Sequence, residues 1–207
     1  MDPALLDAAL TTFVTLLVVI DPIGLTPIFI ALTAGMDARA RRRIGLRGVA
    51  VAFFILALFG LGGDQLLKLV GISMPAFRIS GGIMLFLIAL DMLFESRSAR
   101  REKNADAPEP DPSVFPLAVP LIAGPGAMAT MILLSDQQSG DAAGQAMIYL
   151  MLLAVLSICM ALFLIGGFIE RLLGRTGIRV VSRLLGVLLG ALSVQFVIDG
   201  VRSVNWG

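Results

Sequence analysis

The residue types best suited to chemistry lie in two short motifs, each in the middle of a long apolar stretch. The first is Ile-Asp-Pro-Ile-Gly at residues 20–24, and the second is Ala-Gly-Pro-Gly-Ala at residues 123–127. Proline lacks a backbone N–H and pushes the preceding residue away from helical geometry, and glycine loosens the backbone further. We therefore predict that a membrane-spanning helix is interrupted at each motif.

A helix interrupted in the membrane offers two kinds of binding group. The C-terminal end of the first half presents unpaired carbonyls that attract a cation or an ammonium group, and the N-terminal end of the second half presents N–H groups that attract a carboxylate. This combination suits a small zwitterion such as an amino acid. The alternative is that both prolines only kink their helices. The candidate substrate-binding residues are Asp21, Pro22, Ile23, Gly24, Thr26, Gly124, Pro125, Gly126, Ala127 and Thr130.

Asp21 is the acid expected closest to the middle of the membrane. A carboxylate there costs about 2.5–3.5 kcal/mol on the insertion scale, so an acid at this depth is a functional candidate. It could carry a proton, or it could pair with a substrate ammonium or with Na⁺; the expected coupling ion is therefore H⁺ or Na⁺. The alternative is a neutral acid that caps the second half-helix, and both roles could hold together.

Other chemistry is restricted by composition. The chain has no histidine and a single cysteine, which argues against zinc sites, Ser-His or Cys-His catalysis and an intrachain disulfide. It also lacks a pair of midplane acids, so we expect neither an enzyme nor a metal or organic cofactor. Thr26, Thr130 and Ser135 could supply hydroxyl ligands, although such groups more often bond their own backbone or a neighbouring helix. Arg78, Asp91 and Asp199 lie near span ends, where snorkelling or structural ion pairs are expected.

The elements that position the motifs are membrane spans. Of the 207 residues, 57% are hydrophobic and 15% are charged, which is too apolar for a soluble domain. A span needs about 20 mostly apolar residues. The first stretch lacks the features of a cleavable signal peptide and is expected to remain as a span. Six stretches qualify, at about 9–34, 44–62, 72–93, 114–135, 146–168 and 180–201.

The charges predict an orientation in the bilayer. Most of the 16 basic residues lie in three connecting segments, 39–47, 97–103 and 171–183, and basic loops favour the cytoplasmic side. Both termini are then outside, in the cytoplasmic (inner) membrane of a bacterium. The basic run at 41–43 could instead be a nucleic-acid or anionic-lipid patch, but topology explains all three clusters at once. The net charge of +1 does not favour nucleic acid, so the expected partners are the bilayer and a small zwitterionic substrate.

The chain divides into two related halves. A polar, proline-containing segment at 95–113 is expected to be a cytoplasmic linker between a first unit, 1–94, and a second unit, 114–207. An offset of about 103 residues superposes the two Pro-Gly motifs. Because each half has an odd number of spans, related halves must be inverted. The predicted fold is an all-α membrane protein whose six helices form two inverted three-helix repeats, with helices one and four broken. The remaining glycine pairs are expected at close helix crossings, either within one chain or in a homo-oligomer.

Four motifs, in order, resemble those of one family. They are residues 21–29 (DPIGLTPIF), 78–83 (RISGGI), 116–127 (PLAVPLIAGPGA) and 194–200 (VQFVIDG). The chain resembles the MarC family of bacterial and archaeal inner-membrane proteins, which belongs with the LysE-type transporters. The SnatA members of that family are described as transporters of small neutral amino acids. Family members often carry asparagine where this chain has Asp21, and an asparagine can bind a substrate or Na⁺ but cannot carry a proton.

The resemblance implies a secondary transporter of glycine, alanine, serine or threonine that works by alternating access. Export and import are both open at this stage. The family name reflects an association with multiple antibiotic resistance, so an exporter of another small molecule or drug is one alternative. A channel is the other.

Overall fold

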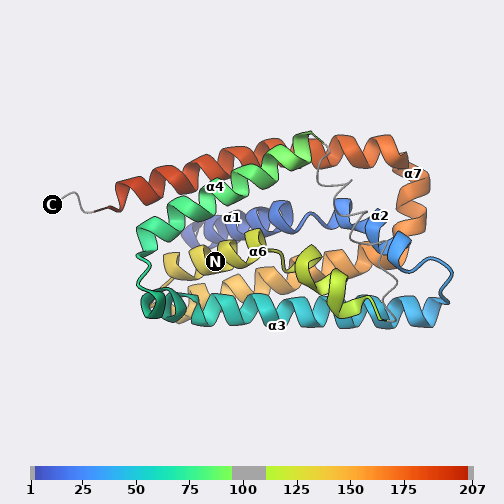
Figure 1. Cartoon of the computed structure of the whole chain (residues 1–207), viewed down its shortest axis with the longest axis horizontal. Coiled ribbons are helices and arrows are strands. Elements are labelled where there is room, and N and C mark those ends of the chain that lie inside the picture. The colour runs from blue at the N-terminus through green and yellow to red at the C-terminus, as the bar shows by residue number, and fades with distance from the viewer. Residues whose placement is uncertain (1–2, 95–110, 205–207) are drawn as a thin grey trace.

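A computed structural model describes residues 3–94 and 111–204 of the chain (Figure 1). The regular elements of this part are all helical, and the predicted linker falls largely on residues 95–110, outside the described residues. The elements are α1 (Pro3–Ile20), α2 (Pro22–Leu32), α3 (Ala38–Val70), α4 (Met74–Leu93), η1 (Ser113–Ile122), α6 (Pro125–Gln137) and α7 (Ala142–Arg202).

The lengths and hydropathy of the helices agree with the prediction of a membrane protein. Within the described residues, five helical stretches are long and apolar enough to cross a bilayer, and η1 with α6 forms a pair bent by 58° that counts as a sixth when the two helices are taken as one broken span. The five are Leu5–Leu32, Ala38–Val70, Met74–Leu93, Ala142–Gly166 and Thr176–Arg202. The all-helical membrane fold is thus confirmed, while the inverted relation of the two halves stays a prediction.

Two helices extend well beyond their predicted apolar segments. α3 begins at Ala38 because the Asp37 carboxylate accepts the N–H of Ala40 as an N-cap, so the arginine-rich first turns are helical as well. α7 carries the last two spans in one helical trace that is interrupted only by Gly174, where φ is 63° and ψ is 171°. That conformation is essentially restricted to glycine, and it turns the chain without a separate loop.

Glycines bring α4 and α7 into close contact, as Figure 1 shows for the two ribbons. A Cβ atom added at Gly82 on α4 would lie 2.8 Å from the carbonyl oxygen of Ser193 on α7. A Cβ atom at Gly186 on α7 would lie 2.9 Å from Cβ of Met92 on α4. The glycine pairs therefore serve helix crossings, as the sequence predicted.

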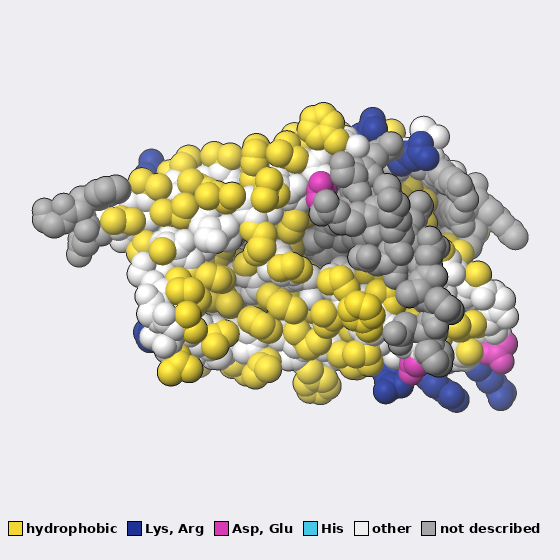
Figure 2. Space-filling model, in the orientation of Figure 1, with side chains coloured by type: hydrophobic (Ala, Val, Ile, Leu, Met, Phe, Trp, Pro, Cys, Tyr) yellow, Lys and Arg dark blue, Asp and Glu magenta, His cyan; other side chains and the backbone are white. Residues whose placement is uncertain are grey.

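The bundle has two chemically different ends. One end contains the end of α3, the start of α4 and the end of α7, because Gly200 of α7 packs against Pro75 and Ile79 of α4. Its basic residues are Lys68, Arg78 and Arg202. We call this the sparse end. The other, the arginine-rich end, contains the start of α3 and residues 174–183 of α7. Figure 2 shows Lys and Arg side chains near the ends, with a broad apolar surface between them.

Candidate functional site: two helix breaks at the bundle centre

The first break is centred on Asp21. α1 ends at Ile20 and α2 begins at Pro22, while Asp21 itself adopts a left-handed conformation with φ 54° and ψ 63°. Asp and Asn are among the non-glycine residues that best tolerate this region. The Asp21 side chain is 3% exposed, and its Oδ1 accepts the N–H of Gly24 at 3.0 Å. The predicted interruption and the alternative role of Asp21 as a helix cap are both present.

Gly24 makes room for the carboxylate of Asp21. A Cβ atom at position 24 would lie 2.1 Å from Oδ2 of Asp21, far inside van der Waals contact. Only glycine therefore lets the carboxylate fold over the first turn of α2. The carboxyl group of Asp21 is therefore held over this break by local backbone geometry.

The side chain of Thr26 forms a hydrogen bond within its own helix. Its hydroxyl donates to the carbonyl of Pro22 at 2.9 Å, and its methyl group packs where Gly166 of α7 leaves space. One residue further, Pro27 has no N–H, so the carbonyl of Ile23 does not receive the usual hydrogen bond from residue 27. Pro27 thus adds a second backbone irregularity one turn into α2.

The second break follows a wide, irregular helix. Within η1, Phe115 and Val119 have extended conformations, with φ −127° at both, and each precedes a proline, which disfavours the helical region. The N–H of Ala123 bonds the carbonyl of Ala118, five residues back. η1 ends at Ile122 and α6 begins at Pro125, as predicted.

The start of α6 differs chemically from the start of α2. Its N-cap is Gly124, which has no side chain with which to bond the first-turn N–H groups. The N–H of Met128 donates to the carbonyl of Gly124. The N–H groups of Gly126 and Ala127 lie in the first turn of α6, where backbone N–H groups have no carbonyl of the same helix to bond. One break therefore carries its own carboxylate, and the other is suited to an incoming one.

The two breaks meet near the centre of the bundle. Figure 1 shows α1 and α6 in one half of the molecule and α2 and η1 in the other. A Cβ atom at Gly126 would lie 3.9 Å from Cγ1 of Val19, two residues before Asp21, and 2.5 Å from Cδ1 of Ile88 on α4. The half-helices α2 and α6 thus start near one another and run toward opposite ends.

Thr130 lies on the same face of α6 as Gly126, one turn further along. Its side chain is fully buried, and its hydroxyl has no hydrogen-bond partner among the described residues. Buried hydroxyls are normally paired, so this oxygen is a candidate ligand group. The hydroxyl of Thr26 bonds its own helix, whereas that of Thr130 has no such bond among the described residues.

The remaining predicted site residues differ in their exposure. Pro22, Gly126 and Ala127 are buried, Ile23 and Gly124 are half-buried, and Pro125 is exposed. Pro125 therefore starts α6 at the surface of the bundle. Sequence reasoning missed the buried Thr12 and Thr15 on α1, whose spacing of three places them close together on that helix.

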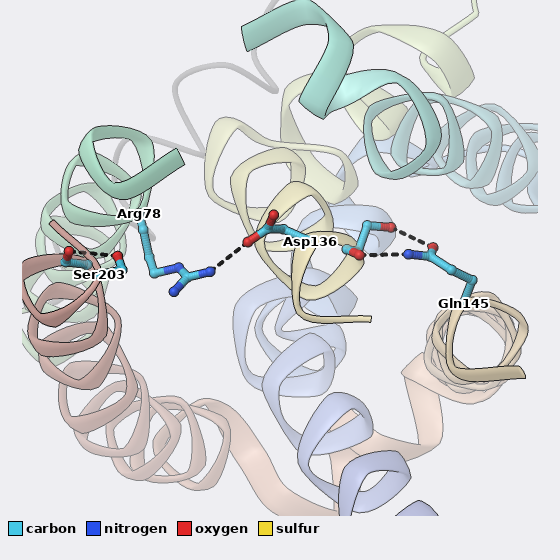
Figure 3. A network of polar contacts seen from close by, with 6 residues as sticks. Arg78, Asp136, Gln145 and Ser203 are labelled. Carbon is cyan, nitrogen blue, oxygen red and sulfur yellow. Dashed lines mark hydrogen bonds and ion pairs between the residues drawn. The ribbon is translucent and has the colours of Figure 1, made fainter. Parts of the chain in front are cut away.

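An ion pair ties the helices together at the sparse end. Nη2 of Arg78 on α4 lies 2.6 Å from Oδ2 of Asp136 on α6, and the side chains are 16% and 23% exposed (Figure 3). The adjacent Ser135 donates its hydroxyl to Gln145 of α7 and accepts from the Gln145 amide at its carbonyl, at 3.0 and 2.6 Å. Of the two roles expected for Arg78, snorkelling or a structural ion pair, the structure shows the ion pair, which links the far end of α6 to α4.

We expect Arg78→Gln to lower the free energy of unfolding by about 1–3 kcal/mol, because it leaves the Asp136 carboxylate half-buried without its cation. The exposed Lys68–Asp64 pair supplies the control, since Lys68→Gln should cost about 0–1 kcal/mol. Thermal unfolding in detergent measures both. Equal shifts for the two variants would show that the Arg78 pair is no stronger than a surface pair.

Five to six apolar spans among the described residues, with two helix breaks at the bundle centre beside a buried acid, define a multi-pass integral membrane protein. The sequence model described as "MarC family integral membrane protein" matches residues 6–205, and the chain belongs to this family.

Relatives named UPF0056 membrane proteins are similar along nearly their whole length. One from Archaeoglobus fulgidus is 37% identical, covering 93% of this chain and 91% of the relative. YvbG from Bacillus subtilis is 35% identical, covering 93% of each chain. YhcE from Escherichia coli is 33% identical, with 93% and 91% covered. No solved structure matches the chain with comparable significance.

Proposed function

We propose that the chain is a secondary transporter of small neutral amino acids that binds its substrate between the two helix breaks. The observation that carries the proposal is their unequal chemistry. Asp21 supplies a buried carboxylate at one break, and Gly124 leaves the N–H groups of the α6 start without a side-chain cap at the other. A zwitterion has the complementary pair of charges.

The substrate carboxylate would bind the N–H groups of Gly126 and Ala127, where the α6 dipole favours negative charge. The substrate ammonium would bind Asp21 and nearby backbone carbonyls. This assignment narrows the sequence-based hypothesis, in which both half-helix starts hold the carboxylate, because the Asp21 carboxylate already accepts from the first turn of α2.

The walls of the proposed site favour a small side chain. Gly126 faces Val19, Leu85 and Ile88, and Ala127 is buried. A charged or long polar side chain would lose its hydration there without compensation. Glycine, alanine, serine and threonine fit this environment, and the Thr130 hydroxyl is a partner for the hydroxyl of serine or threonine.

Alternating access requires that the breaks open to each side in turn. Ile20, Asp21, Ile122 and Ala123 are all buried, so the breaks are closed in this conformation. We assign the arginine-rich end to the cytoplasm, which puts both termini outside. We also assign Asp21 as the residue that binds the coupling ion, H⁺ or Na⁺. The Arg78–Asp136 pair then lies on the outer side.

The test is counterflow in liposomes. Vesicles loaded with unlabelled alanine should take up labelled glycine, alanine, serine or threonine against its gradient, and uptake should saturate. Labelled glutamate and lysine are the matched controls and should not exchange. Absence of exchange for all four neutral amino acids would refute the substrate class, and uptake without saturation or counterflow would indicate a channel.

Thr130→Val gives a finer test because it keeps the shape and removes the hydroxyl. We expect the preference for serine over alanine to fall about 3- to 10-fold, as the loss of one hydrogen bond of about 1 kcal/mol implies. Alanine counterflow itself should persist. An unchanged preference would place the hydroxyl of Thr130 outside the binding site.

A further inference from the structure

A stripe of arginines lines a hollow on α3 at the arginine-rich end. Arg39, Arg42, Arg43 and Arg47 have the spacing of one helix face, and together with Leu46 they line a hollow of about 500 Å³. A second hollow of about 240 Å³ shares two of these arginines and reaches Asp111. In Figure 2, Lys and Arg side chains gather at the end of the molecule where α3 begins.

The stripe holds more positive charge than the residues described around it neutralise. Arg47 pairs with Asp111, which lies just before η1. Among the residues that the structure describes, none forms an ion pair with Arg39, Arg42 or Arg43, and all three are exposed. Such a cluster of guanidinium groups favours phosphate, which arginine binds through paired hydrogen bonds.

An apolar strip continues from the arginines along the same helix face. Phe54 and Leu58 follow Arg47 by about two and three helical turns, and their side chains are 71% and 68% exposed. At about 1.5 Å per residue, these side chains lie about 10 and 17 Å deeper along the helix than Arg47. The helix thus presents a cationic head region followed by an exposed apolar strip.

We propose that the arginine hollow binds the headgroup phosphate of an anionic phospholipid whose acyl chain lies along Phe54 and Leu58. A preference of basic loops for one side of the membrane explains why arginines are present at this end. It does not require four of them to share one face above an exposed apolar strip. A nucleic acid would use the charge but not the strip.

The hollow is connected to the second helix break. Arg47 lies in both hollows and pairs with Asp111, and Asp111 lies two residues before η1. The backbone N–H of Ser113 donates to Oδ1 of Asp111, and Ser113 together with Arg47 lowers the pKa of Asp111, so this carboxylate stays ionised at neutral pH. A lipid phosphate in the hollow therefore competes with Asp111 for Arg47 and acts on the helix that leads to the break.

The experiment uses the full chain in an uncharged detergent, titrated with short-chain phosphatidylglycerol while thermal unfolding is followed. Phosphatidylcholine and inorganic phosphate are the matched ligands. Phosphatidylglycerol should raise the unfolding temperature in a saturable manner, and neither of the other two should do so at the same concentration. Native mass spectrometry should detect phosphatidylglycerol retained on the protein.

The variant Arg42→Gln/Arg43→Gln should weaken apparent phosphatidylglycerol affinity about 30-fold, which corresponds to about 2 kcal/mol. Arg41→Gln is the control, since Arg41 is on the same turns of α3 but does not line the hollow. It should weaken the affinity less than about threefold, because Arg41 does not line the hollow and its attraction to the headgroup is screened by salt. A larger loss for Arg41→Gln would mean that bulk charge, not the hollow, attracts the lipid. An equal effect of phosphatidylcholine or of inorganic phosphate would overturn the proposal as well.

Discussion

Replacing Asp21 with alanine should reduce amino-acid counterflow about 10- to 100-fold. A hydrogen bond to a charged group contributes about 1.5–3 kcal/mol, and each 1.4 kcal/mol is a factor of ten. Alanine also tolerates the left-handed conformation of residue 21 poorly and cannot cap Gly24. The measurement is the initial rate of counterflow in liposomes, normalised to the amount of folded protein.

Asp21→Asn separates the charge of this residue from its structural role. Asparagine adopts the left-handed conformation readily and can accept the Gly24 N–H through its amide oxygen. We expect this variant to retain transport within about tenfold of the unmodified chain and to lose the pH dependence of transport. A pH dependence that survives the substitution would exclude Asp21 as the proton carrier.

Gly24→Ala tests the position of the carboxylate without changing any charge. The added methyl group would overlap with the Asp21 carboxylate and displace it, so transport should fall even though Asp21 is present. Gly62→Ala, on α3, is the control because a Cβ atom there meets no atom within 4 Å. Full transport by Gly24→Ala would show that the carboxylate need not lie over the start of α2.

Gly82→Leu should destabilise the fold by about 3 kcal/mol or more, the upper range for overpacking. Even its Cβ atom would lie 2.8 Å from the Ser193 carbonyl oxygen and 3.1 Å from the Val197 backbone nitrogen, and backbone atoms cannot move aside as a flexible side chain can. The helices α4 and α7 would have to separate. We expect a markedly lower yield of folded protein and a lower unfolding temperature.

Gly190→Ala is the matched control at the same helix crossing. A Cβ atom at position 190 would lie 3.8 Å from Cβ of Ala89, which is ordinary contact, and alanine favours a helix by up to about 1 kcal/mol over glycine. Stability should be unchanged or higher. Cys159 is the single cysteine of the chain and is buried, so its reaction with a fluorogenic maleimide reports unfolding of either variant. Equal stability of the two variants would contradict the close crossing at Gly82.

The helix breaks could be predicted from the sequence because their causes are local. Proline and glycine act on the backbone within one turn, so the ends of α1 at Ile20 and of η1 at Ile122 follow from the two motifs. The capping role of Asp21 is also local. The difference between an aspartate cap and a glycine cap can also be seen in the sequence. Only the structure shows that the two differently capped breaks lie close together, where they can bind opposite charges of one ligand.

Features that depend on packing could not be predicted in this way. Thr26 and Thr130 are the same residue type in similar surroundings, yet one bonds its own helix and the other is buried with no hydrogen-bond partner in the described part of the chain. The partner of Arg78 lies 58 residues away on another helix. The exposure of Pro125 depends on how α6 packs against its neighbours, which no local pattern records.

Gly174 has a consequence at the level of the gene. Its φ of 63° and ψ of 171° lie where a side chain would clash with the backbone, so the turn between the last two spans depends on the absence of a Cβ atom. Every base change in the first or second codon position of a glycine replaces it with a residue that has a Cβ atom, or with a stop. At position 174, every amino-acid change that a single base change can produce therefore strains the joint between the two spans by about 1–3 kcal/mol.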